Sequence, residues 1–157
     1  MLKGIIDKNR VIAVSGGFDP VHIGHIRYLK AASELGKVLV ILNTDAWLTR
    51  KKGKPFMLFQ ERKEVLEALR YVHRVVPVID ADDSVAESIL LYKPDVFAKG
   101  GDRTIENIPV EEKEACLRIG AQLIVGVGGG KVQSSSWLIN AVVKTPRTGN
   151  FENEKNQ

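Results

Sequence analysis

The chain alternates short, nearly continuous apolar runs with longer amphipathic segments. The apolar runs are rich in β-branched residues, and they predict five β-strands at residues 11–14, 38–43, 72–78, 96–98 and 122–126. Strands that are apolar along their whole length are typical of a parallel sheet covered on both faces. The segments between them repeat apolar residues at helical spacing and predict helices at residues 26–35, 60–70, 84–91, 110–119 and 136–143.

This alternation of strands and helices predicts the fold class. We expect an α/β protein with a Rossmann-like, doubly wound parallel sheet of about five strands and helices on both faces. Residues 1–144 are expected to form a single domain, and the polar, aperiodic residues 145–157 a disordered tail. Ligands in such folds bind beyond the carboxyl ends of the strands, where the strand order reverses. The segments that follow the predicted strands are therefore the candidates for a site.

The segment after the first strand reads Ser-Gly-Gly-Phe-Asp-Pro-Val-His-Ile-Gly-His over residues 15–25. Its glycines let the backbone approach a ligand closely. The helix start behind them presents free N–H groups and a positive dipole to an anion such as phosphate. His22 and His25 lie three residues apart on the first helical turn and are expected to point at that anion together. Two imidazoles above a bed of N–H donors favour phosphoryl or nucleotidyl transfer.

Composition limits the expected partners and location of the protein but does not indicate its reaction. The chain has 157 residues, is 44% hydrophobic and carries a net charge of +4 from scattered basic residues, which suits small anions as well as nucleic acid. It has no apolar run long enough to span a bilayer and no signal-peptide core, so we expect a cytoplasmic protein. The single cysteine, Cys116, permits no intrachain disulfide and is expected to be a buried thiol on an apolar helix face.

Residues 18–25, Phe-Asp-Pro-Val-His-Ile-Gly-His, resemble the HxGH signature of the cytidylyltransferase-like nucleotidyltransferase superfamily. Its members join a nucleotide to a phosphate-bearing substrate and release pyrophosphate. The resemblance extends from about residue 10 to residue 143, and its motifs occur in the family's order. After HxGH come Asn-Thr-Asp at 43–45, a lysine-rich segment at 50–55, Glu-Arg at 61–62, Lys-Gly-Gly-Asp at 99–102 and Ser-Ser-Ser at 134–136.

The resemblance implies catalytic roles for His22, His25 and Lys51. It implies that the nucleotide is bound by residues of the same segments: Gly16, Gly17, Phe18, Asp19, Gly24, Lys54, Gly100, Gly101, Asp102, Ser134, Ser135 and Ser136. Mg²⁺ is the expected cofactor. It is expected to be held mainly by the nucleotide phosphates, with Asp19 as a candidate protein ligand, because hard cations prefer oxygen ligands.

The basic segment after the second strand has two interpretations. Arg50, Lys51, Lys52 and Lys54 surround Gly53, and we expect a mobile loop that closes over phosphates. A solvated surface loop would be the usual interpretation, but the position after a strand favours phosphate binding. Lys51 and Lys54 are the best candidates, because related cytidylyltransferases carry lysines at these places.

The motifs at residues 99–102 and 134–136 indicate which subgroup of the superfamily the chain resembles. Lys-Gly-Gly-Asp is similar to the sequence found at this point in the adenylyltransferase domain of bacterial ADP-heptose synthase, whereas glycerol-3-phosphate cytidylyltransferases usually differ there. The serines are good helix caps, but they also resemble the family's Ser-Ser/Thr-Thr motif, which holds the triphosphate. Many members place Arg or Lys close behind that motif. Here Trp137 follows instead, and Lys131 is the candidate to compensate.

The sequence therefore predicts a nucleotidyltransferase that uses ATP or CTP and a phosphorylated small molecule, a sugar phosphate being favoured. A CTP-dependent polyol- or alcohol-phosphate cytidylyltransferase is the alternative within this class. A non-catalytic nucleotide-binding protein and a nucleic-acid-binding domain are alternatives from other classes, the latter disfavoured by the few aromatic residues among the lysines. We expect a homo-oligomer with no nucleic-acid or membrane partner.

Overall fold

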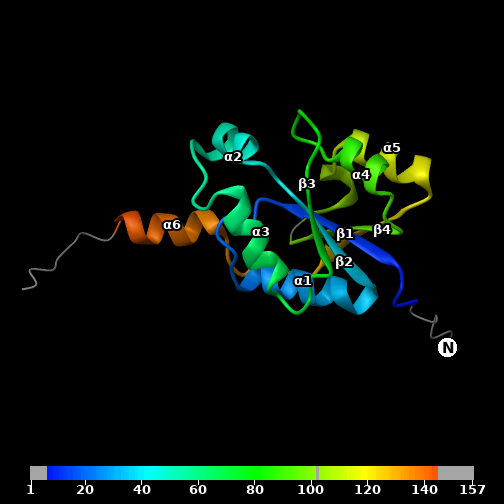
Figure 1. Ribbon diagram of the computed structural model, residues 1–157, viewed down its shortest axis with the longest axis horizontal. Helices are drawn as coiled ribbons and strands as arrows, with labels where there is room; N and C mark the ends of the chain where they lie inside the picture. Colours follow the sequence, from blue (N-terminus) through cyan, green and yellow to red (C-terminus); the bar gives the residue numbers. More distant parts are fainter. Residues whose placement is uncertain (1–6, 102, 145–157) are drawn as a thin grey trace, which may run out of the picture.

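The computed structural model describes residues 7–101 and 103–144. Asp102 and the predicted tail at 145–157 lie outside the described residues. Five parallel strands form one sheet in the order β3-β2-β1-β4-β5 (Figure 1). They are β1 (Val11–Gly16), β2 (Lys37–Leu42), β3 (Arg74–Pro77), β4 (Val96–Gly100) and β5 (Gln122–Val127). The predicted Rossmann-like α/β fold is confirmed.

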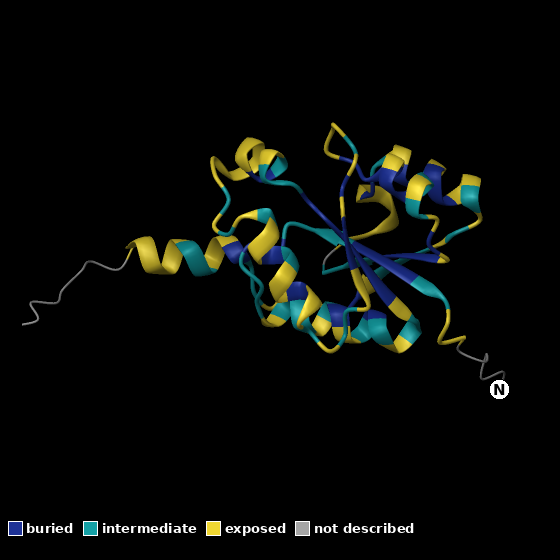
Figure 2. Cartoon of the chain, in the orientation of Figure 1, coloured by how far each residue is buried: buried dark blue, intermediate teal, exposed yellow. Residues whose placement is uncertain are grey.

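Helices cover both faces of the sheet because its strands are apolar on both sides. Helices α1 (Ile23–Leu35) and α3 (Phe59–Glu67) pack on one face, where Leu29 and Leu66 join the core formed by Ile12 and Val14 of β1. Helices α4 (Ala86–Tyr92) and α5 (Val110–Ile119) cover the other face, which Ala13 of β1 joins. Figure 2 shows that the central strands β2, β1 and β4 are largely buried between these two layers.

The order of the strands locates the point where a ligand is expected. From β1 the chain moves outward to β2 and β3, then crosses back to add β4 on the other side of β1, followed by β5. The connections that leave β1 and β4 at their carboxyl ends therefore diverge. Such a divergence leaves a crevice that side chains do not fill.

The sequence predicted a loop for the basic segment at residues 50–55, but only residues 53–55 lie outside a helix or strand. Residues Asp45–Lys52 form helix α2, whose N-cap is Thr44, with its hydroxyl oxygen accepting from the backbone N–H of Trp47 at 3.2 Å. The helix ends at Gly53, with φ at +88°, a conformation that favours glycine. Arg50, Lys51 and Lys52 thus lie in the last helical turn, where cations stabilise a helix. The prediction failed because Leu48 is the only buried residue of α2, so the segment shows no apolar periodicity.

Arg62 of α3 is fully buried, with an exposed fraction of 0%, and its guanidinium joins four segments. Its Nη1 donates to the carbonyl oxygens of Gly17 at 2.9 Å and Asn43 at 2.7 Å. Its Nε donates to the carbonyl of Met57 at 2.9 Å, and its Nη2 to Oδ1 of Asp45 at 2.7 Å. One side chain therefore fixes the ends of β1 and β2, the start of α2 and the entry to α3.

The chain continues past β5 into α6 (Ser135–Lys144), and a short 3₁₀ helix, η1 (Ile105–Asn107), precedes α5. Helix α6 extends away from the sheet, and Ser135 is its only buried residue (Figures 1 and 2). Cys116 is a buried free thiol, as expected. Among the described residues, no helix has both the length and the apolar character needed to cross a bilayer.

Replacing Arg62 with lysine is predicted to destabilise the fold. A lysine ammonium cannot reach four acceptors that lie in different directions, so buried carbonyls lose their donors. We expect Arg62→Lys to lower the free energy of unfolding by about 2–4 kcal/mol in urea denaturation. Arg118→Lys, on the exposed face of α5, is the matched control and should change it by less than about 0.5 kcal/mol. Equal effects of the two substitutions would contradict the role assigned to Arg62.

Candidate functional site

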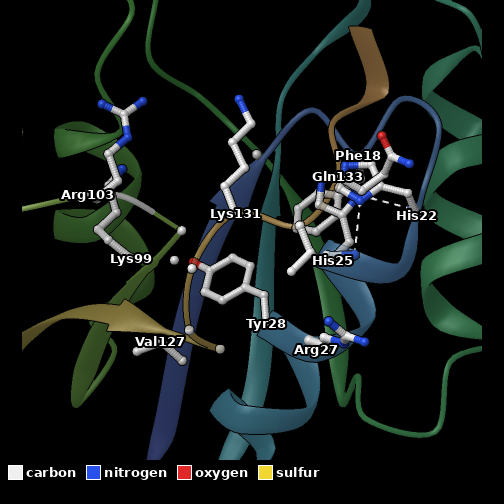
Figure 3. Close-up of a pocket in the computed structure, with 18 of the residues that line it drawn as sticks. Phe18, His22, His25, Arg27, Tyr28, Lys99, Arg103, Val127, Lys131 and Gln133 are labelled. Atoms are coloured by element: carbon white, nitrogen blue, oxygen red, sulfur yellow. Dashed lines mark hydrogen bonds between the residues drawn. The ribbon is translucent and has the colours of Figure 1, made fainter. Parts of the chain in front are cut away.

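A pocket of about 230 Å³ opens at the carboxyl ends of β1, β4 and β5, at the reversal of strand order (Figure 3). The end of β1, the first turns of α1 and the glycine-rich segments after β4 and β5 form its walls. Its lining residues are Ser15, Gly16, Phe18, His22, Gly24, His25, Arg27, Tyr28, Lys99, Gly100, Gly101, Arg103 and residues 127–133.

His22 and His25 form the start of α1 and one wall of the pocket. Nδ1 of His22 accepts from the backbone N–H of Gly24 at 3.1 Å, and Nδ1 of His25 accepts from the backbone N–H of His22 at 3.2 Å. The two rings stack with their centroids 3.7 Å apart (Figure 3). Because each Nδ1 accepts a hydrogen bond, each neutral ring carries its hydrogen on Nε2. The capping bonds therefore fix the tautomer of both rings.

The surroundings keep both histidines neutral at pH 7. Burial lowers the pKa of His25 from 6.5 to about 3, and the nearby charges of His22 and Lys52 act in the same direction. The pKa of His22 is also lowered, by burial and then by the charges of Lys52 and Lys131. Neutral imidazoles with Nε2–H groups are hydrogen-bond donors.

The turn before the histidines has a constrained backbone. Phe18 is buried with φ at +48°, and its ring centroid lies 4.7 Å from that of His25. A Cβ at Gly24 would lie 2.9 Å from the His22 ring, so the HxGH glycine leaves room for the stacked rings. Gly16 lines the pocket, whereas Gly17 lies behind it and gives its carbonyl oxygen to Arg62.

Tyr28 of α1 sets the distance between the histidine wall and the segments after β4 and β5. Its hydroxyl donates to the backbone carbonyl of Ala98 on β4. A Cβ at Gly100 would lie 2.9 Å from the Tyr28 ring, and a Cβ at Gly128 would lie 2.8 Å from the Tyr28 Cα. Burial raises the pKa of the Tyr28 hydroxyl, which keeps it protonated as a donor. The segments after β4 and β5 thus pack directly on the helix that carries the histidines.

The described lining residues include four cations and no carboxylate: Arg27, Lys99, Arg103 and Lys131. Nζ of Lys99 lies 3.1 Å from Oε2 of Glu112, which is buried, so this charge is compensated. No ion pair joins the other three to any residue in the described ranges. A positive pocket with several donors attracts an anion.

The structure separates the two lysines predicted from the sequence from this pocket. Nζ of Lys51 lies 2.6 Å from Oδ2 of Asp83, and Lys54 is exposed; neither lines the pocket. Lys52 is close enough to lower the pKa of both histidines. Sequence reasoning passed over Lys52, because the orientation of adjacent lysines follows from a helix that was not predicted.

Asp19 and the serines have structural contacts in the protein. The Asp19 carboxylate is buried and accepts from the backbone N–H groups of Phe56 at 2.6 Å and Met57 at 2.7 Å. Ser134 caps α6, with its hydroxyl oxygen accepting from the N–H of Trp137 at 3.1 Å. The hydroxyl of Ser135 donates to the Pro20 carbonyl at 2.9 Å.

The lining of the pocket does not include these residues. Asp19 and Ser134–Ser136 are not among the residues that line it, whereas Lys131 and Gln133, just before the serines, are. Gly100 and Gly101 line the wall after β4, and Asp102, which follows them, lies outside the described residues.

A comparison with known families matches residues 13–126 to the cytidylyltransferase-like family model. The chain belongs to the cytidylyltransferase-like family. This match spans the histidine wall, three of the five strands completely and most of the other two, and it confirms the resemblance inferred from the sequence. Family membership supports the prediction that the protein is an enzyme of the nucleotidyltransferase type.

Individual relatives agree with this assignment. The bifunctional protein HldE of Pelobacter propionicus is 38% identical over 123 residues, which are 76% of this chain but only 23% of that protein. FAD synthase of Pyrococcus abyssi is 36% identical over 115 residues, which are 72% of this chain and 77% of that protein. The crystal structure of a lipopolysaccharide core biosynthesis protein from Thermoplasma volcanium superposes with a TM-score of 0.63 at 26% identity. That match covers 78% of this chain and 98% of the other.

The donor set of the family pocket suits phosphate oxygens better than a bare metal ion. No three His, Cys, Asp or Glu side chains of the described ranges gather as a metal-binding group. Both Asp19 oxygens already accept backbone hydrogen bonds. Mg²⁺ therefore fits this pocket as an ion held by nucleotide phosphates, in keeping with its preference for a few protein ligands plus substrate phosphates.

The lowered pKa of His25 predicts a specific loss of stability in acid. Below pH 6.5 the unfolded chain binds a proton at this residue, whereas the folded chain does so only near pH 3. Folding stability from this source is thus complete above pH 6.5 and falls as the pH drops toward 3. His25→Gln removes the titration and keeps a side chain able to cap the helix.

Urea denaturation at pH 7 and pH 4.5 tests this prediction. We expect wild type to lose about 2 kcal/mol more than His25→Gln between these two pH values. An equal loss in both proteins would show that His25 titrates normally in the folded state.

Proposed function

We propose that the protein is a nucleotidyltransferase that transfers a nucleoside monophosphate from a nucleoside triphosphate to a phosphorylated small molecule and releases pyrophosphate. The observation that carries this proposal is the stacked histidine pair. Two neutral rings line the pocket at a helix start, and because the backbone engages both Nδ1 atoms, each ring keeps its Nε2–H as a donor. This arrangement suits phosphate oxygens, and the family supports the same chemistry.

The reaction needs little from the protein beyond positioning and charge stabilisation. An oxygen of the acceptor phosphate forms a bond to the α-phosphorus, and the bond from that phosphorus to the bridging oxygen of pyrophosphate breaks. The acceptor phosphate is anionic at pH 7, so no general base is required. His22 and His25 donate to α- and β-phosphate oxygens, whose negative charge increases in the transition state.

The cations around the pocket have distinct proposed parts. Lys52 and Lys131, whose charges act on His22, are proposed to meet the triphosphate. Lys51 and Lys54 would have to move to do so, and Lys51 would first have to leave Asp83. Mg²⁺ bound to the phosphates would neutralise part of their charge. Gly16, Phe18, Gly24, Gly100 and Gly101 are proposed to contact the nucleotide through the pocket wall.

ATP or CTP with a sugar phosphate is the proposed substrate pair. The similarity to HldE proteins and the Lys-Gly-Gly-Asp motif favour the sugar phosphate. The similarity to a FAD synthase makes flavin mononucleotide a second acceptor to test. We also propose that residues 1–144 act as one domain and that the enzyme is a homo-oligomer, as related enzymes often are.

Pyrophosphate release tests the proposal directly. ATP, CTP, GTP and UTP are each combined with Mg²⁺ and with sugar phosphates, polyol phosphates, alcohol phosphates and flavin mononucleotide. Release with one donor and one acceptor is the expected result, and it would identify both substrates. A triphosphate that binds in calorimetry without release from any pair would favour a non-catalytic nucleotide-binding protein. If no triphosphate binds, the assignment of a phosphate site to the two histidines is wrong.

The histidine wall provides the control for this assay. His22→Ala is expected to lower kcat by at least about 100-fold, since it removes a donor to charge that develops in the transition state. His73→Ala, an exposed histidine at the edge of β3, should leave kcat unchanged and unfold at the same urea concentration as wild type. An active His22→Ala enzyme would contradict the proposed role.

Lys52 is predicted to contribute more to nucleotide binding than the adjacent Lys51. Lys52→Met is expected to raise KM for the nucleoside triphosphate about tenfold, because a charge close to the histidines is removed. Lys51→Met is the matched control, and it should change KM by less than about threefold, since exposed ion pairs contribute little. A larger effect at Lys51 would show that α2 rearranges when the nucleotide binds.

A further inference from the structure

Lys131 lines the pocket from a glycine-rich segment whose backbone packs only partly against the rest of the protein. It follows Gly128, Gly129 and Gly130, of which the first two have φ of +86° and +80°. A Cβ at Gly128 would press on α1, but at Gly129 and Gly130 it would meet nothing within 4 Å. Backbone packing therefore does not fix the position of Lys131. Figure 3 shows its side chain over the pocket, between Arg103 and the histidine wall.

An aromatic ring provides the missing restraint. The Lys131 ammonium lies 4.9 Å from the ring centroid of Trp137. Trp137 is on the first turn of α6, and the hydrogen bond from its backbone N–H to Ser134 anchors that turn. Its exposed fraction is 54%, so solvent reaches the pair.

We propose that Trp137 is a positioning residue that holds Lys131 at the pocket beside His22, where this cation meets the outer phosphates of the nucleotide. The proposal rests on the proposed function of the same site. It adds a residue outside the pocket lining to that function, through contact with one side chain inside it.

A ring and a carboxylate have different effects on a lysine. Lys99 and Lys51 are each paired with a carboxylate, Glu112 and Asp83, which compensates their charge. An aromatic face attracts a cation through its quadrupole and leaves the net charge in place. Lys131 can therefore be positioned by Trp137 and still present a full positive charge to a phosphate.

The charges that act on His22 make the position of Lys131 measurable. The charges of Lys52 on α2 and Lys131 after β5 both act on this histidine, and the imidazole of His25 stacks on its ring. Lys131 contributes to the lowered pKa of His22. If Trp137 holds Lys131 there, loss of the ring must raise the pKa of His22 even without substrate.

The first measurement is an NMR titration of the His22 ring in Trp137→Leu, Trp137→Phe, Lys131→Met and the Trp137→Leu/Lys131→Met double variant. We expect the pKa of His22 to rise in Trp137→Leu and Lys131→Met. It should rise less in Trp137→Phe, which keeps an aromatic face. The double variant should match Lys131→Met alone. If the pKa of His22 in Trp137→Leu equals the wild-type value while the pKa in Lys131→Met is raised, the proposal is overturned.

The second measurement is calorimetric binding of inorganic tripolyphosphate to the same variants. Trp137→Leu is expected to weaken binding about two- to fivefold, the range for an exposed cation–π contact, and Trp137→Phe less. In the Lys131→Met background, Trp137→Leu should have no further effect. A further loss in that background would show that Trp137 supports the fold of α6 rather than Lys131, and it would overturn the proposal.

Neither measurement depends on turnover. An enzyme that releases no pyrophosphate, but whose His22 titration follows Lys131 and Trp137 as described, would contradict the proposed function alone. An active enzyme whose His22 pKa ignores Trp137 would contradict this inference alone.

Discussion

The fully buried guanidinium of Arg62 is the constraint on which the site depends. A buried cation is costly unless its donors are satisfied, and here three carbonyl oxygens and one carboxylate converge on it. These acceptors belong to the turn after β1, the end of β2, the start of α2 and the entry to α3. The backbone that leads into the histidines and the helix that carries Lys52 are therefore held in one arrangement by a side chain that never reaches the pocket.

The sequence predicted the sheet well and one helix not at all. All five strands were expected within a few residues of their observed ends, and α5 was expected at its observed bounds, because long apolar patterns reflect a two-faced core. Helix α2 has one buried residue, so its stability comes from its capping threonine, its terminal cations and the bond between Asp45 and Arg62. Such contacts leave no periodic trace in a sequence.

The sequence likewise identified the site residues that are positioned locally, but not those that are positioned by distant parts of the chain. His22 and His25 were identified because the whole arrangement is local, within one capped helical turn. The orientation of Lys51 and Lys52 depends on α2 and on Asp83, far along the chain, so adjacent lysines could not be told apart. Arg62 appeared only as part of a motif, since nothing in its neighbours shows that its partners lie up to 45 positions away.

The packing of Tyr28 limits how this pocket can diversify during evolution. Gly100 and Gly128 both lie against it without room for a side chain, so mutations at these positions would displace the helix that carries the histidines. Gly101, Gly129 and Gly130 have open space, and Arg103 and Lys131 are exposed. Substitutions at Gly130, Arg103 and Lys131 can therefore change the shape and charge of the pocket while the histidine wall keeps its position, whereas the positive φ of Gly101 and Gly129 strains any other residue there. A pocket built this way has one part that packing fixes and another part that is open to substitution.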